Sequence, residues 1–138
     1  MPTFELHPHL AADTIDLGEL ALCRILLMND ANYPWLILVP QRPNLREIYE
    51  LDTEAQIQLI HESSHVARCM STLFKADKIN IAALGNMVPQ LHIHHIARTT
   101  NDPAWPAPVF GVHPARPYSQ QALAEQQTTL QALLQAHF

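Results

Sequence analysis

The sequence predicts an α+β fold in which antiparallel strands pack against one long helix. Three observations lead to this prediction: short apolar runs separated by polar turn residues, a helical pattern between Thr53 and Phe74, and a second helical pattern near the C-terminus. Apolar runs joined by short polar turns indicate antiparallel strands. With 138 residues, 48% of them hydrophobic, the chain is expected to fold as one domain around a buried core.

The composition narrows the range of partners. A formal net charge of −5 argues against a nucleic-acid backbone or an anionic bilayer as the main partner, and the apolar runs are far shorter than a membrane span. Cys23 and Cys69 are too few and too far apart for a disulfide framework or a zinc knuckle. Since nothing near the N-terminus resembles a signal peptide, we expect a cytoplasmic protein with a small ligand, no cofactor, and neither nucleic acid nor membrane as partner.

The first elements along the chain are predicted to be strands. Phe4 to His7 alternates between apolar and polar residues, which predicts an edge strand that ends at Pro8. Cys23 to Met28 and Trp35 to Val39 are two apolar runs on either side of a polar turn. Two such runs form a hairpin.

A long helix is predicted from Thr53, a plausible N-cap, to about Phe74. Asp52 and Glu54 place negative charge at its N-terminus, which the helix dipole favours. At about 100° per residue, apolar side chains gather on one side of this helix, and that side should lie on the sheet. Its members are Leu59, Ile60, Val66, Ala67, Met70, Leu73 and Phe74.

Two further strands are predicted after the long helix. Lys78 to Leu84 is apolar at both odd and even positions, which predicts a strand that is covered on both faces for part of its length. Gly85 to Pro89 then turns the chain. Gln90 to Arg98 follows as an antiparallel neighbour.

The last part of the chain is predicted to be an ordered extended arm followed by a helix. Five prolines lie between residues 99 and 118, and Trp105, Val109 and Phe110 need a surface to cover. Ser119 is expected to cap the helix. The apolar side of that helix is made by Leu123, Leu130, Leu133 and Leu134.

The strand from Gln90 to Arg98 carries two imidazoles on one face. Because side chains alternate along a strand, Gln90, His92 and His94 share a face while His95 points to the opposite one. A neutral imidazole can attack phosphorus when its other ring nitrogen donates a hydrogen bond, and a neighbouring imidazole can donate to the phosphate oxygens. The pattern predicts a phosphoryl-transfer site. Its structural alternative is a pair of core histidines bonded to the backbone.

A second histidine pattern competes with the first. His61-Glu62-Ser63-Ser64-His65 matches the HExxH spelling of zinc hydrolases and lies in the predicted helix. The helical wheel places His61, His65 and Arg68 opposite the apolar side, so the two imidazoles should face water. A catalytic zinc site also needs a third protein ligand and shelter from bulk solvent. We therefore predict no metal site here and keep a zinc hydrolase as a third hypothesis.

The segment from Gln90 to Arg98 resembles the signature of the histidine triad family, His-x-His-x-His followed by apolar residues. Alignment on Arg98 puts Gln90, His92 and His94 in the three triad positions, and Gly85-Asn86 falls on the turn that precedes them. The chain looks like a bacterial branch of that family with a Gln-x-His-x-His variant of the triad. The similarity includes the hairpin, the long helix and the arm that contains Trp105.

The resemblance implies a HIT-like fold, with about five antiparallel strands, a long helix packed on them and a C-terminal helix. Residues 1–138 would form one domain, with a core at about 20–98 and the proline-rich arm and last helix at 99–138. A homodimer is also implied. The implied reaction is hydrolysis or transfer of a nucleoside monophosphate through a nucleotidyl-histidine intermediate. The substrate would be a purine nucleotide conjugate such as a nucleoside phosphoramidate or a dinucleoside polyphosphate.

The resemblance also assigns roles by position. His92 would be the nucleophile, oriented by a backbone carbonyl, and His94 would stabilise the phosphoryl oxygens or the leaving group. Asn86 would contact phosphate. Asn29 or Asp30 would bind the ribose hydroxyls.

This sequence departs from the family pattern at several positions. Gln90 replaces the first histidine; its amide can keep a supporting hydrogen bond to the nucleotide, but it cannot titrate. Pro34-Trp35 replaces the usual Gly-His before the second strand of the hairpin. A second register, with His92, His94 and Ile96 as the triad, would make His94 the nucleophile but loses the matches at Arg98 and Asn86. Because of Gln90, a nucleotide-binding module with little or no turnover is the alternative function.

Overall fold

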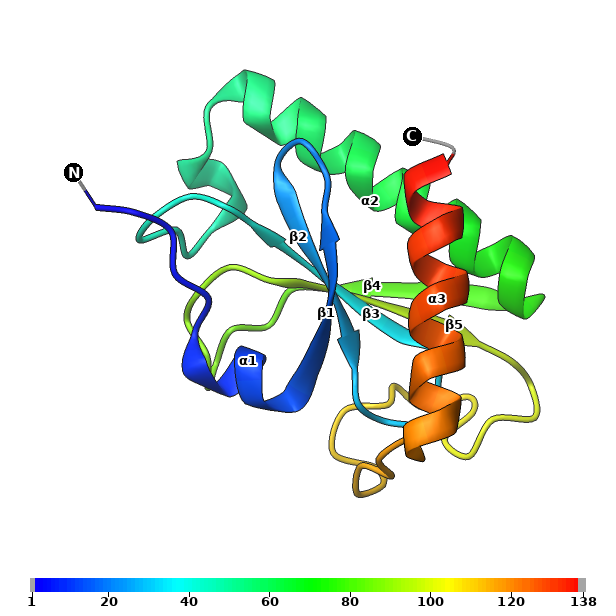
Figure 1. The fold of residues 1–138 in the computed structure, drawn as a ribbon. Helices are drawn as coiled ribbons and strands as arrows, with labels where there is room; N and C mark the ends of the chain where they lie inside the picture. Colours follow the sequence, from blue (N-terminus) through cyan, green and yellow to red (C-terminus); the bar gives the residue numbers. More distant parts are fainter. Residues whose placement is uncertain (1, 137–138) are drawn as a thin grey trace.

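A five-stranded antiparallel sheet forms the centre of the molecule, as predicted for an α+β fold. The computed structural model describes residues 2–136, and the strand order is β1-β2-β3-β5-β4. Two long helices, α2 and α3, lie across the sheet, and the short α1 leads into β1 (Figure 1). The elements are α1 Pro8–Asp13, β1 Thr14–Glu19, β2 Cys23–Met28, β3 Trp35–Pro40, the 3-10 turn η1 Ile48–Glu50, α2 Thr53–Phe74, β4 Lys78–Ala82, β5 Ile93–Arg98 and α3 Gln120–Ala136.

The hairpin and the histidine strand form as predicted. β2 and β3 pair antiparallel from Cys23 opposite Pro40 to Leu27 opposite Leu36. β5 pairs with β3 on one side and with β4 on the other, both antiparallel. His94 lies opposite Ile37 in this register, so the histidine strand is one of the inner strands of the sheet.

The predicted edge strand at residues 4–7 is wrong. The edge strand is β1, which starts only at Thr14 and pairs with β2. Pro8 begins α1 instead of ending a strand, because its fixed φ suits the first helical position, and the Nδ1 atom of His7 accepts a hydrogen bond from the amide of His9. β1 itself contains a bulge at Gly18, whose φ of +114° favours glycine.

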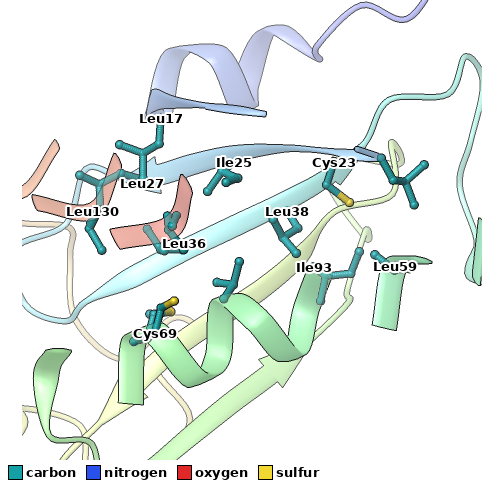
Figure 2. Packing of buried hydrophobic residues seen from close by; sticks show 14 of the residues in the cluster. Leu17, Cys23, Ile25, Leu27, Leu36, Leu38, Leu59, Cys69, Ile93 and Leu130 are labelled. Carbon is teal, nitrogen blue, oxygen red and sulfur yellow. The ribbon is translucent and has the colours of Figure 1, made fainter. Parts of the chain in front are cut away.

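The main hydrophobic core lies between the sheet and the two long helices. Side chains from β1, β2, β3 and β5 meet those of α2 and α3 there, and Figure 2 shows Leu36, Leu38 and Ile93 among them. In α3, Leu130 and Leu134 are fully buried, and the hydroxyl of Ser119 accepts a hydrogen bond from the amide of Ala122 at 3.1 Å. The predicted cap and apolar side of the last helix are therefore confirmed.

The buried side of α2 differs in part from the prediction. Leu59, Val66 and Met70 are buried as expected, but Ile60 is 63% exposed and Glu62 is fully buried. Compared with the prediction, the helix is rotated about its axis so that polar side chains also face the sheet. Glu62 bonds to the amides of Leu22 and Cys23, and Ser63 bonds to His95. A hydrophobicity pattern does not detect such contacts. The N-cap is Asp52, whose carboxylate accepts from the amide of Ala55, and not Thr53.

β4 is an edge strand, and the expectation that both of its faces are covered for part of its length is met only in part: Ile79 packs against the main core and Asn80 is half-buried. It pairs only with β5, and Ile81 and Leu84 are each 52% exposed. The apolar side chains of this segment therefore remain in part at the surface of the protein.

The second face of the sheet is covered by segments with little regular structure. Phe4, Leu6 and Leu10 from the N-terminal segment and Ala104, Val109 and Phe110 from the arm contact this face. The sheet contributes apolar side chains that point away from the two long helices, namely Leu26, Trp35, Ile37, Val39 and Ile96. The predicted need of the arm for a surface is confirmed at Val109, which is 4% exposed. Among the described helices, none is long and apolar enough to cross a membrane.

Candidate active site

His92 and His94 lie side by side on the second face of the sheet. His94 is in β5, and His92 is the residue just before this strand, so strand alternation points both rings to the same side. Their ring centroids are 4.9 Å apart in an edge-to-face arrangement. Each side chain is about as buried as the core, at 7% exposed. The two residues that the sequence singled out are therefore brought together.

The ring of His92 is held in one tautomer by the backbone. Its Nδ1 atom lies 2.7 Å from the carbonyl oxygen of Gln90. A carbonyl oxygen can only accept, so Nδ1 carries the proton and the Nε2 atom of the neutral ring keeps its lone pair. Among residues 2–136, nothing bonds to this Nε2 atom. The ring therefore presents a free nucleophilic nitrogen.

The ring of His94 is held in the opposite tautomer by a tryptophan. The indole Nε1–H of Trp35 donates to the Nδ1 atom of His94 at 3.0 Å. Nδ1 is then the acceptor and Nε2 carries the proton. Burial, and after it the neighbouring imidazoles of His92 and His95, lower the pKa of His94 to about 4. At neutral pH this ring is an uncharged hydrogen-bond donor.

An aromatic layer from the arm covers the second histidine. The ring of Phe110 lies 5.0 Å from that of His94 and 5.7 Å from that of Trp35, both edge to face. Arg98 holds the start of this arm in place: its guanidinium makes two hydrogen bonds to Asp102, at 2.8 and 3.1 Å, and another to the carbonyl of Ala107. The arm therefore forms one wall of the site.

The side chain of Gln90 is bonded to the N-terminal segment. Its Oε1 atom accepts from the amide of His7 and its Nε2 atom donates to the carbonyl of Glu5, both at 2.8 Å. Both ends of the amide are thus used within the protein. A contact between Gln90 and phosphate stays a prediction.

The predicted ribose ligands lie at the end of β2. The Asn29 side chain accepts from the amide of Tyr118 at 2.9 Å, and the Asp30 carboxylate accepts from the amides of Asn32 and Arg116. Both residues thus hold the end of the arm. They also line a cleft of about 400 Å³ whose wall includes Trp35, so they lie on the same side of the sheet as the histidine pair.

Asn86 is not brought into direct contact with the histidine pair. It is exposed in the loop between β4 and β5, after Gly85, whose φ of +77° favours glycine. No hydrogen bond of its side chain is present within residues 2–136. Its contact with phosphate stays a prediction.

His95 lies on the opposite face, as predicted. Its Nδ1 atom donates to the carbonyl of Ile93 at 3.0 Å, and its Nε2 atom accepts from the hydroxyl of Ser63 in α2 at 2.7 Å. The side chain is fully buried, and burial lowers its pKa to about 4. His95 therefore joins β5 to α2 and takes no part in the candidate site.

The HExxH segment has a structural role in the folded chain. Glu62 accepts hydrogen bonds from the amides of Leu22 and Cys23, each at 2.8 Å. His61 is exposed, but the expectation that His65 also faces water is wrong: its Nε2 atom donates to the carbonyl of Leu134 in α3. Within residues 2–136 no three His, Cys, Asp or Glu side chains are grouped so as to hold a metal ion.

Two residues of this site were not identified from the sequence as part of it. In the sequence, Trp35 is only a departure from the family pattern, and Phe110 is only a side chain that needs a surface. Alternation along β3 does place Trp35 and Ile37 on one face, and Ile37 is opposite His94. The contact between indole and imidazole required the pairing register of β3 and β5, which a single sequence does not contain.

Several known proteins share the fold of this chain. A family model described as the HIT domain matches residues 6–101. The chain is similar to a histidine triad protein from Marinobacter aquaeolei VT8, with 54% identity, a TM-score of 0.95, and 97% of this chain and 98% of that one covered. A histidine triad protein from Bradyrhizobium japonicum shares 48% identity at a TM-score of 0.94, with 96% of this chain and 99% of that one covered. No curated protein matches the chain.

The chain is also similar in fold to a more distant protein. A hypothetical histidine triad nucleotide-binding protein from Sulfolobus tokodaii strain7 shares 15% identity at a TM-score of 0.67, with 88% of this chain and 84% of that chain covered. At this identity the similarity concerns the fold alone.

Proposed function

The chain belongs to the histidine triad, or HIT domain, family, and on that premise we propose that it hydrolyses or transfers nucleoside monophosphates through a nucleotidyl-histidine intermediate. The substrates would be purine nucleotide conjugates, either nucleoside phosphoramidates or dinucleoside polyphosphates. A homodimeric state and a cytoplasmic location belong to the same proposal.

The tautomer of His92 is the observation that carries this proposal. Its Nδ1–H donates to the carbonyl of Gln90 at 2.7 Å, so the lone pair on Nε2 is available for attack on phosphorus. This hydrogen bond also stabilises the positive charge that the ring acquires once the N–P bond forms. The competing assignment, with His94 as nucleophile, is disfavoured because Trp35 leaves the proton on the Nε2 atom of that ring.

His94 suits the role of a neutral donor to the transferred phosphoryl group. Its ring centroid is 4.9 Å from that of His92, close enough for both rings to contact one phosphate. Positioning and charge stabilisation are most of what phosphoryl transfer requires from a protein. The cleft at Asn29 and Asp30 is the proposed seat of the ribose, with Asn86 and Gln90 as further proposed phosphate ligands.

Trapping of the covalent intermediate tests the proposal. The protein is mixed with diadenosine tetraphosphate or an adenosine phosphoramidate labelled at the adenylyl phosphorus, and the reaction is stopped in alkali, in which phosphohistidine survives. We expect label on wild type and none on His92→Ala, with kcat/KM reduced by roughly 10⁴-fold or more. His61→Ala, which removes an exposed histidine of α2, is the matched control and should be labelled like wild type.

Two outcomes would count against the proposed mechanism. Label that persists in His92→Ala would show that another residue is the nucleophile. Binding of AMP in calorimetry, without label and without hydrolysis of either substrate, would support the alternative of a nucleotide-binding module. That alternative is favoured by one observation, the commitment of the Gln90 amide to the N-terminal segment.

A further inference from the structure

The hydrogen bond between Trp35 and His94 limits what His94 can do. The indole Nε1–H points at the Nδ1 atom of the imidazole at 3.0 Å, and both side chains are buried, at 8% and 7% exposed. An imidazolium carries a proton on each ring nitrogen. Protonation of His94 would therefore place two N–H groups against each other, and it requires that this buried hydrogen bond be broken.

The surroundings of His94 offer nothing that would compensate for a positive charge. Trp35 faces it from β3, Phe110 from the arm, and His92 from its own strand. The imidazoles of His92 and of His95, which lies on the other face of the same strand, both disfavour a positive charge on His94. No carboxylate among the described residues influences this ring.

We propose that Trp35 is a positioning residue that keeps His94 in the neutral Nε2–H tautomer and thereby restricts the site to phosphoanhydride-linked nucleotides, excluding nucleotides linked through a P–N bond. The inference rests on the proposed function, and it selects one of the two substrate classes named there. It follows from a difference between the two leaving groups, since an amine must be protonated in order to leave and a phosphate need not be.

In the favoured reaction the leaving group needs no proton. The Nε2 lone pair of His92 forms a bond to the adenylyl phosphorus while the P–O bond of the anhydride breaks, and the electron pair leaves on a phosphate oxygen. Phosphate oxyanions are stable near neutral pH, since the second pKa is about 6. In the second step water bonds to phosphorus, the N–P pair returns to Nε2, and the proton of the water goes to solvent. His94 only donates a hydrogen bond throughout.

A phosphoramidate makes a different demand on the site. Its P–N bond can break readily only if the nitrogen receives a proton, because an amine does not leave as an anion. A neutral Nε2–H imidazole is far too weak an acid to supply that proton. General acid catalysis contributes about 10²- to 10⁴-fold, so the wild-type protein should lose a factor of this size on amine leaving groups.

A paired assay at pH 7.5 tests the substrate class. The probes are diadenosine tetraphosphate and an adenosine 5′-phosphoramidate of a simple alkylamine. We expect kcat/KM for the tetraphosphate to exceed that for the phosphoramidate by about 100-fold or more. Equal rates, or a preference for the phosphoramidate, would overturn this inference and leave the proposed function standing. Failure to cleave or label with either probe would overturn both.

The role of Trp35 is tested separately with a matched pair of variants. Trp35→Phe keeps an aromatic ring but removes the N–H donor, while Trp105→Phe makes the same change in a partly exposed tryptophan that lies over Arg98. We expect Trp35→Phe to raise phosphoramidate cleavage relative to tetraphosphate cleavage by about tenfold or more, with phosphoramidate cleavage now rising as pH is lowered, because the imidazolium of His94 no longer has to break a hydrogen bond from the indole. Trp105→Phe should leave both the ratio and the pH profile unchanged.

A spectroscopic measurement on the wild-type protein tests the tautomer without any variant. Nitrogen-15 shifts of the His94 ring at pH 7 should show an unprotonated Nδ1 and a protonated Nε2. A protonated Nδ1, or a ring that titrates near pH 6.5, would overturn the inference. So would a Trp35→Phe variant that folds, as judged by circular dichroism, and keeps the wild-type substrate ratio and pH profile.

Discussion

Gln90, which stands in place of the first triad histidine, has a structural role in this chain. Its amide both donates and accepts, which lets it bond to the carbonyl of Glu5 and the amide of His7 at the same time. Its backbone carbonyl meanwhile orients His92. The residue at the first triad position therefore links the N-terminal segment to the proposed nucleophile. Its partners lie 85 and 83 residues away in the chain, so no local pattern could reveal them.

Removal of the Gln90 amide should loosen the N-terminal segment. In Gln90→Ala the amide of His7 and the carbonyl of Glu5 lose their partner, and the loss of such a hydrogen bond near the surface costs about 0.5 to 1.5 kcal/mol. We expect faster hydrogen exchange at the amide of His7 and a free energy of unfolding lowered by about that amount. Gln121→Ala, in an exposed part of α3, is the control and should alter neither quantity.

The same variant also tests whether Gln90 binds the ligand. If its amide contacts phosphate, calorimetry should find weaker AMP binding in Gln90→Ala. Unchanged exchange at His7 would contradict the bonding described for the N-terminal segment.

At the scale of secondary structure, periodicity predicted the elements well and their surroundings less well. The bounds of the hairpin strands and of α2 follow from apolar runs and helical spacing. The prediction of an edge strand at residues 4–7 was wrong because alternation alone does not identify strands reliably. Pro8 begins a helix, and the bulge between Asp16 and Gly18 interrupts the alternation of the true edge strand β1. The exposure of Ile81 in β4 could not be predicted because the order of strands in the sheet, not the sequence of one strand, decides which strand lies at an edge.

Glu62 explains why the rotation of α2 could not be predicted. A hydrophobicity pattern places a glutamate toward water, yet this carboxylate is fully buried and satisfied by the amides of Leu22 and Cys23 and by the side chain of Gln58. A buried charge of this kind is tolerated only with such partners. The glutamate of the HExxH segment therefore serves the contact between α2 and the turn that joins β1 to β2.

Substitution of Glu62 should reduce stability without affecting metal content. Glu62→Gln replaces one acceptor oxygen with a donor that faces a backbone N–H, and an unsatisfied buried group costs about 1 to 3 kcal/mol. We expect urea unfolding to show a loss of this size, whereas His61→Ala, at an exposed position of the same segment, should stay within about 0.5 kcal/mol of wild type. Stoichiometric zinc in the purified protein that His61→Ala removes would instead revive the zinc hydrolase hypothesis.

Across the whole molecule, the sheet separates the main hydrophobic core from the candidate site. The face toward α2 and α3 holds the main core, with His95 bonded to Ser63 between β5 and α2. The other face holds His92 and His94 under the N-terminal segment and the arm. Alternation along one strand predicted which histidine belongs to which face. The walls of the site come from segments far apart in sequence, so only the folded chain shows them.

This division leaves two neutral imidazoles buried on opposite sides of one strand, and stability should depend on pH as a result. Burial lowers the pKa of His94 and of His95 to about 4, against about 6.5 for an unfolded chain. Between these values the unfolded state binds more protons than the folded state. The stabilisation is therefore complete above about pH 6.5 and is lost as pH falls toward 4.

Urea unfolding between pH 7.5 and pH 5 measures this dependence, in a range above the titration of most carboxyl groups. The free energy of unfolding should fall with a slope that approaches about 1.4 kcal/mol per pH unit for each of the two histidines. In His95→Asn the slope should drop by about half, whatever the variant costs in absolute stability, because only His94 remains. In His61→Ala it should not change, since that side chain is exposed in the folded state. A wild-type free energy that is level from pH 7.5 to pH 5 would mean that both rings take up protons in the folded protein as readily as in the unfolded chain, and for His94 this would contradict its bond from Trp35.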